Sequence, residues 1–358
     1  MTFYQELQLN QAGSKNYVAG FKKPKDKFVH ILIFIFKVLL NLVFSMAVIM
    51  LLSMLFGYEN SIAGLVVLLG ISTFRFTDLD MHATHSVGGI FFIFFIFAVG
   101  PKAANLAPTG CDLLINFLCI LLIVIVGCHN VKWFNHAILV LSYVLLYGSD
   151  VSGFSYVKRL ICLLLGATLT SLVLYRNRRK TEFKNGFKDI VSDFSLSESR
   201  SRWQIKIALC VSGAVFIATL LNFPKPVWAG IAAMSVTVPV GNIKERVEGR
   251  IRGNMIADIM FIFVSIAVPV EFMQYASMAG GFGAGFCGKY EGQTAWNSLS
   301  AMTVAASVIG VYSTIVYRII NNVLGALFAF ALGTVIERVL SGLYDLFIKA
   351  KQRRTLRR

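Results

Sequence analysis

Residues 317–335 read YRIINNVLGALFAFALGTV, and this stretch combines a long apolar run with charged and polar residues at its start. Its apolar part is long enough for a membrane helix, which needs about 20 residues to cross a hydrocarbon core of roughly 30 Å. Its beginning is polar, because Arg318, Asn321 and Asn322 stand at the start of the apolar run. Charged groups inside a membrane are costly and normally face a cavity, a partner or the protein interior. The stretch therefore predicts a membrane-spanning helix with one polar face.

The composition of the whole chain agrees with this reading. Of 358 residues, 56% are hydrophobic and 15% are charged, and the mean hydropathy is +0.70. Soluble domains have about 25% charged residues. The net charge of +16 does not indicate nucleic-acid binding, because the basic residues concentrate in particular loops. The six cysteines form no CxxC pair, so neither a disulfide framework nor a zinc site is predicted.

The apolar runs predict an all-α polytopic membrane protein with about twelve transmembrane helices. The expected spans are residues 30–56, 61–75, 86–101, 112–128, 134–149, 156–175, 203–222, 227–241, 251–269, 271–288, 295–312 and 316–343. The corresponding segments are a cytoplasmic N-terminal segment (1–29), a first six-helix half (30–175), a cytoplasmic linker (176–202), a second six-helix half (203–343) and a basic cytoplasmic tail (344–358).

The distribution of basic residues predicts the orientation. With the N-terminus in the cytoplasm, about 27 of the 34 lysines and arginines lie on the cytoplasmic side and about five lie near the outer face. Lysine and arginine are enriched in cytoplasmic loops of membrane proteins. We therefore expect both termini in the cytoplasm and the protein in a bacterial plasma (inner) membrane.

An internal repeat relates the two halves. The spacing Arg-x6-Gly-Ala occurs at Arg159–Ala167 and again at Arg318–Ala326. Ala-Gly pairs also occur early in each half, at residues 63–64 and 229–230. Two halves with the same orientation form a parallel repeat about an axis along the membrane normal. Chance similarity between apolar helices is the alternative.

At these residues the chain resembles a known family. Pro226-Val-Trp228-Ala229, followed by Arg246-Val-Glu-Gly249-Arg250-Ile-Arg-Gly253 and an apolar helix, is similar to the FUSC family, named for fusaric acid resistance and including aromatic acid exporters. The resemblance is clearest over residues 203–340. It implies an exporter of organic anions. Many members of the family also carry a large soluble cytoplasmic region, where this chain has only the linker and short tails.

Arg159 and Arg318 are the strongest candidates for a substrate site. Arg318, Asn322, Gly325 and Ala329 recur at helical spacing and share one face, with Asn321 beside them. The arginines can bind one anion together, reach the outer headgroups through long side chains, or form a structural ion pair.

The remaining candidates are more scattered. The spans 61–75 and 227–241 are short, and the second contains Ser235, Thr237 and Pro239. Short or proline-interrupted segments at matching positions indicate a transport site, whereas an ordinary kinked helix is the alternative. Lys37 and Lys206 lie in the first helix of each half, near its cytoplasmic end.

Asp258 is the candidate for a proton relay, although a structural pair with Arg250 or Arg252 also explains it. His82 and His85 are two possible metal ligands where three or four are needed, so no metal is expected. No nucleotide-binding motif, cofactor site or catalytic pairing is discernible in the sequence.

Together these observations predict a membrane transporter, and not an enzyme, that exports organic anions such as aromatic carboxylates without ATP. A passive anion channel and a non-transporting membrane scaffold are the alternatives. The expected partners are the lipid bilayer, a small organic anion and possible further copies of the chain, without nucleic acid.

Overall fold

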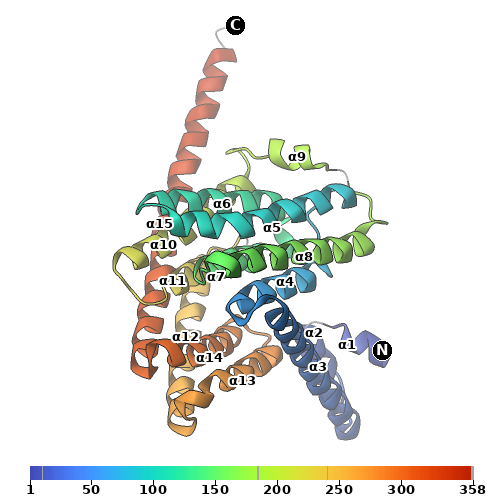
Figure 1. Cartoon of the computed structure of the whole chain (residues 1–358). Helices are drawn as coiled ribbons and strands as arrows, with labels where there is room; N and C mark the ends of the chain where they lie inside the picture. The colour runs from blue at the N-terminus through green and yellow to red at the C-terminus, as the bar shows by residue number, and fades with distance from the viewer. Residues whose placement is uncertain (10, 184, 240, 356–358) are drawn as a thin grey trace. The chain divides into compact units, whose positions relative to one another are not determined.

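The structure is a computed structural model, and it describes residues 1–9, 11–183, 185–239 and 241–355. The described residues form helices and no strands (Figure 1). The α-helices are α1 (Phe3–Leu7), α2 (Gln11–Ala19), α3 (Pro24–Phe56), α4 (Ser61–Phe74), α5 (Ala83–Leu106), α6 (Cys111–Gly127), α7 (His136–Tyr147), α8 (Gly153–Arg178), α9 (Phe187–Ser192), α10 (Ser199–Leu220), α11 (Val227–Val236), α12 (Ile243–Ala267), α13 (Met273–Phe286), α14 (Tyr290–Ile309) and α15 (Val311–Thr355). Short 3₁₀ turns are η1 (Tyr58–Asn60), η2 (Val131–Trp133) and η3 (Val270–Phe272).

The prediction of an all-α chain is confirmed, since each of the expected apolar segments contains a helix. In the part of the chain that the structure describes, five helices are long and apolar enough to cross a membrane, by length and composition: α3, α5, α8, α10 and the part of α15 from Val311 to Val339. Several of the others are shorter apolar helices, and α11 has only 10 residues. At 1.5 Å per residue, a helix of that length covers about 15 Å. The predicted tail is helical as far as Thr355, and its last three residues lie outside the described ones.

The helices group into two packing units. Unit 1 contains residues 1–48 and 245–322, and unit 2 contains residues 49–244 and the chain from Val323 onward. Each unit combines segments from both predicted halves. Because the units reflect contacts and not sequence similarity, the predicted domain boundaries and the parallel repeat stay predictions.

Unit 2 is built around α5. This helix packs against both α6 and α8, and α8 also packs against α4 (Figure 1). The contact between α4 and α8 is close, because a Cβ at Gly70 would lie 2.9 Å from Thr170 Oγ1. In the same way, Gly325 of α15 lies against the backbone carbonyl of Ala229 in α11. Small residues at such crossings are typical of membrane helices.

The connections of unit 2 alternate between two ends. At one end, His129 contacts Asp80, and Asn185 of the linker accepts a hydrogen bond from the His82 amide. At the other end, Lys102 near the end of α5 binds Asp150 before α8 at 2.9 Å. The order of the expected spans across a membrane stays a prediction.

Unit 1 has its own apolar core. It consists of buried side chains from α12, α13 and α14, namely Ala257, Phe261, Met273, Leu299, Met302 and Ala306. α13 and α14 pack along each other (Figure 1). The N-terminal segment docks on the same unit, where Glu6 binds His30 of α3 at 2.8 Å.

The long helices place polar groups inside and large apolar groups outside. On α8, Arg159 and Thr170 are buried, whereas Leu164 and Leu172 are 60% exposed. Water-soluble proteins rarely expose contiguous apolar surfaces of this kind. In lipid the same surface is favourable, and buried polar groups find partners within the protein. The fold is therefore that of a helical protein suited to a lipid bilayer.

The contact at Gly325 gives a stability prediction. Gly325→Val should lower the free energy of unfolding by about 2 kcal/mol or more, because the added side chain overlaps the carbonyl of Ala229, which cannot rotate away. Thermal unfolding in detergent measures the effect. Gly342→Val is the control on the same helix, since no atom lies within 4 Å of a Cβ at that position. Equal midpoints for the two variants would contradict the packing described here.

Candidate functional site

A buried polar cluster lies within unit 1. We call it the unit 1 polar cluster, and it consists of Arg250, Asn254, Asp258, Ser298, Arg318 and Asn322. α12 supplies three of its members at intervals of four residues, so they share one face of that helix. α14 supplies Ser298, and the beginning of α15 supplies the remaining two, one turn apart. All six are buried, at 7% exposure or less.

Arg318 is held by the hydroxyl group of Ser298. Its Nε and Nη2 atoms donate to Ser298 Oγ at 3.2 and 2.6 Å. Ser298 in turn donates to Asn254 Oδ1. The charge of Asp258 acts on Arg318 from α12. Arg318 therefore points into the protein, toward α12 and α14.

Arg250 is held by neutral acceptors. Its Nε and Nη2 atoms donate to Asn322 Oδ1 at 3.1 and 2.9 Å. Tyr290, at the start of α14, adds a side-chain hydrogen bond, and the guanidinium of Arg246 lies 4.3 Å from the centre of the same ring. An amide and a phenol satisfy the hydrogen-bond donors of a guanidinium group but do not balance its charge.

The cluster has one more positive charge than negative charges. It contains the guanidinium groups of Arg250 and Arg318 and the carboxylate of Asp258. An unbalanced charge buried in a low-dielectric interior costs several kcal/mol. A small anion from solution would supply the missing charge, and two guanidinium groups can bind a carboxylate through paired hydrogen bonds.

Two glycines of α12 allow the cluster to form. A Cβ at Gly253 would lie 2.6 Å from the Glu291 carbonyl oxygen, and one at Gly249 would lie 3.3 Å from the Tyr290 ring. The two glycines are one turn apart on α12, so α14 approaches its backbone along this strip. This approach brings Tyr290 and Ser298 within reach of the arginines.

Arg159, the second predicted arginine, lies in unit 2 and is 4% exposed. Its guanidinium donates to Asn60 Oδ1 at 3.0 Å, to the Ser149 carbonyl at 2.6 Å and to the Glu59 carbonyl at 3.4 Å. These contacts join the turn before α4 to the end of α7. Convergence of Arg159 and Arg318 on one anion stays a prediction.

The other predicted site residues of unit 2 have partners within their own unit. The hydroxyls of Ser235 and Thr237 donate to the carbonyls of Ala232 and Ala233, each at 2.8 Å. The Thr237 carbonyl accepts from Trp203 Nε1 at 3.0 Å, which satisfies the backbone where α11 ends. Lys206 binds Glu337 at 3.2 Å.

The remaining predicted residues lie in unit 1. Lys37 donates to the Leu9 carbonyl at 3.1 Å and to the Ser14 hydroxyl, so it fastens the N-terminal segment to α3. Asn321 donates to the Tyr317 carbonyl at 2.9 Å within its own helix. These contacts join neither Lys37 nor Asn321 to the unit 1 polar cluster. The roles of both residues in substrate binding stay predictions.

Asp258 has a different partner from the two expected ones. Arg250 turns to Asn322, and Arg252 lies 3.6 Å from Glu248 on the exposed side of α12. The charge acting on Asp258 comes from Arg318. Sequence reasoning also missed Asn254 and Ser298, and it noted Arg250 only within the family motif and as a possible partner of Asp258. The spacing of four residues from Arg250 to Asn254 to Asp258 is the signal that would have identified the face.

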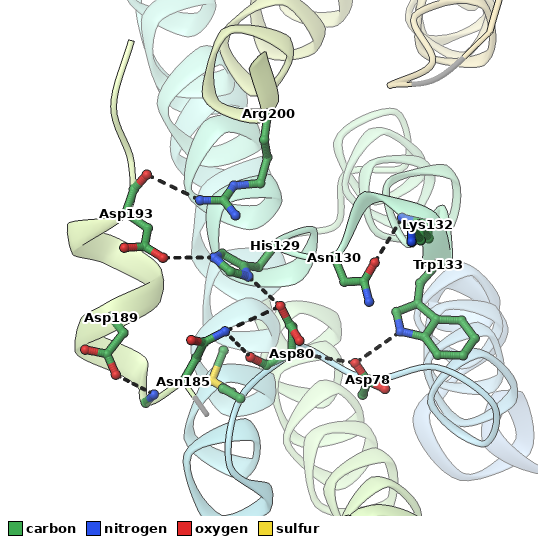
Figure 2. Close-up of polar contacts among 12 residues, drawn as sticks. Asp78, Asp80, His129, Asn130, Lys132, Trp133, Asn185, Asp189, Asp193 and Arg200 are labelled. Carbon is green, nitrogen blue, oxygen red and sulfur yellow. Dashed lines mark hydrogen bonds and ion pairs between the residues drawn. The ribbon is translucent and has the colours of Figure 1, made fainter. Parts of the chain in front are cut away.

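A second polar network fastens the linker to one end of unit 2 (Figure 2). His129, after α6, lies with Nδ1 2.7 Å from Asp80 Oδ2 and Nε2 3.4 Å from Asp193 Oδ2. Nearby, Trp133 Nε1 donates to Asp78 Oδ1 at 3.1 Å, and Asn185 donates to the Asp80 carbonyl at 3.1 Å. Among the described residues no group of three histidine, cysteine or acidic side chains is arranged to hold a metal ion.

Asp78 makes this network sensitive to pH. Burial raises the pKa of its carboxyl group, against the lowering effects of the Asp80 amide and Arg178. A carboxyl whose pKa is raised by folding stabilises the folded state while it is protonated, and this contribution is lost as pH rises through the folded-state pKa.

We therefore expect the melting temperature of the wild type to fall between about pH 4 and neutral pH more steeply than that of Asp78→Asn. Thermal unfolding over this range measures the difference. Asp189→Asn is the control, because that carboxylate lies in the linker, where it accepts from the Gly186 amide. Parallel curves for the wild type and Asp78→Asn would contradict the assignment.

Asn322 gives the corresponding prediction for unit 1. Asn322→Ala should lower the free energy of unfolding by about 2–4 kcal/mol, since it removes both hydrogen bonds from a buried guanidinium. Chemical or thermal unfolding in detergent checks it. Thr334→Ala, also on α15, is the control, because among the described residues the Thr334 hydroxyl donates only to the Phe330 carbonyl within the same helix. A loss no larger than that of the control would show that Asn322 does not hold Arg250.

Comparisons with known protein families, curated proteins and solved structures find no match for this chain. The class that the fold defines is a helical protein with apolar helices suited to a membrane.

Proposed function

We propose that the chain is an integral membrane transporter that exports organic anions, of the aromatic carboxylate type, without ATP. The observation that carries this proposal is the unit 1 polar cluster, which contains two buried guanidinium groups and one buried carboxylate. A structural cluster gains nothing from an excess charge, whereas an anion-binding site requires one.

The chemistry of the cluster suits a carboxylate. Asn322 and Tyr290 hold Arg250 through uncharged acceptors. A carboxylate in their place would add the attraction of opposite charges and can accept two parallel hydrogen bonds from one guanidinium group. The aromatic ring of Tyr290, which lies 4.3 Å from the guanidinium of Arg246, offers apolar surface to the rest of the substrate. An anion with an aromatic body matches both parts.

The proposal includes the finer architecture expected from the sequence. Twelve spans in two parallel six-helix halves, with both termini in the cytoplasm of a bacterial plasma membrane, are supported by the helices found in each expected segment. The short helices α4 and α11 stand at matching positions of the two halves. Short segments of this kind are a feature of transporters built from repeats.

Membership in the FUSC family is part of the same proposal. Its support is that four residues of the family motif all contribute to the contact between α12 and α14, namely Arg246, Gly249, Arg250 and Gly253. The two glycines admit α14, and the two arginines surround Tyr290. A motif that builds a basic cluster gives the resemblance a physical reason.

Flux measurements test the proposal. In proteoliposomes, wild-type protein should transport radiolabelled benzoate or a related aromatic carboxylate, and Arg250→Ala and Arg318→Ala should each lower the rate at least about tenfold, because each removes a charge-assisted hydrogen bond to the anion. Arg252→Ala is the matched control on α12, since Arg252 pairs with Glu248 at the surface.

Each outcome has a clear meaning. Equal loss in Arg252→Ala would indicate a general charge effect and contradict the site. Wild-type protein that moves none of a panel of organic anions would contradict the function. Unitary anion currents would identify a channel with the same site, in place of an exporter.

A further inference from the structure

Asp258 has a buried carboxylate group, and one of its two oxygen atoms accepts no hydrogen bond from the described residues. It is 6% exposed, and its Oδ1 atom has no hydrogen-bond partner in the described part of the chain. Arg318 of α15 is the charge that acts on it, and Arg250 lies two turns earlier on α12. On α14, Ser298 bonds Arg318 and Tyr290 bonds Arg250. Met273 of α13 packs in the apolar core with Ala257, the neighbour of Asp258 in the chain.

We propose that a proton on Asp258 and the transported anion occupy the unit 1 polar cluster together, so that one proton moves with one carboxylate. The inference rests on the proposed function, since it concerns the same site. It adds the coupling ion, its acceptor and the stoichiometry.

The sign of the coupling follows from the geometry. Ionised Asp258 supplies negative charge to Arg318 and competes with an external carboxylate for the same guanidinium group. When Asp258 takes a proton from water, the excess positive charge of the cluster rises and the anion is bound more tightly. By reciprocity, the bound anion favours the protonated form of Asp258 by the same factor.

Exchange of the anion against a proton is disfavoured by the same arrangement. It would require the arriving carboxylate to expel the proton and leave two negative groups beside Arg318. Like charges that share a site repel, and one of them is protonated instead. The loaded site therefore carries the proton and the anion, and both return to water on the other side. Movement of the pair transfers no net charge, so its direction follows the sum of the proton and anion gradients. Export then requires an outward anion gradient that exceeds the inward proton gradient.

Binding of benzoate to the purified full-length chain in detergent tests the proposal. From about pH 6 to about pH 8, the wild-type dissociation constant should rise with pH, by up to about tenfold for each unit, because one proton is linked to one anion. Asp258→Asn should bind benzoate independently of pH, close to the wild-type value at low pH. Glu248→Gln is the matched control, since Glu248 lies on the exposed side of α12 and should leave the slope unchanged.

Proton uptake gives a second measurement, which needs no variant. Calorimetric titration in buffers of different ionisation enthalpy should show protons taken up as benzoate binds to wild-type protein. A wild type that binds benzoate with a constant affinity and without proton uptake would overturn the coupling and leave the proposed function standing. A pH slope that survives in folded Asp258→Asn would overturn the role of Asp258. Absence of both binding and flux of aromatic carboxylates would remove the proposed function and this inference with it.

Discussion

The buried guanidinium of Arg250, held by the amide oxygen of Asn322, is the interaction on which unit 1 depends. A charge of this kind is stable in an apolar interior only if its hydrogen-bond donors are satisfied. That requirement fixes which face α12 turns toward α15, and Asn254 donates to the Arg250 carbonyl on the same face. The glycines of α12 then admit α14, whose Ser298 hydroxyl reaches Arg318.

Unit 2 uses the same chemistry for a different purpose. Arg159 also donates to an amide oxygen, that of Asn60, but its other nitrogens bond the backbone carbonyls of Ser149 and Glu59. Backbone carbonyls of tightly held turns cannot move aside for a ligand, so this arginine fastens helix ends. Arg250 and Arg318 are held by side chains, which can rearrange. This difference in partners is the reason why we propose the unit 1 polar cluster, and not Arg159, as an anion site.

Much of the fold could be predicted from the sequence, because the apolar runs are long and the polar residues interrupt them sharply. The ends of the elements were less predictable. α11 ends at Val236, five residues before the end of the expected span 227–241, since Trp203 holds the Thr237 carbonyl. For the site, Arg318, Asn322 and Asp258 were visible as polar residues in apolar surroundings. Their partners Arg250 and Ser298 come from other helices, and no local pattern indicates such long-range contacts.

The sequence by itself determined that the chain is helical, that its helices are apolar enough for a membrane, and that a few charged residues lie within them. Those features follow from local composition and period. Only the tertiary structure decided which charges meet, because a hydrogen bond between Arg250 and Asn322 joins residues that are 72 positions apart. It brought Asp258 within electrostatic range of Arg318 and left Asp258 Oδ1 without a hydrogen-bond partner among the described residues. The physical reason is that the cost of burying a charge depends on what surrounds it in space, and a chain shows its neighbours only along its length.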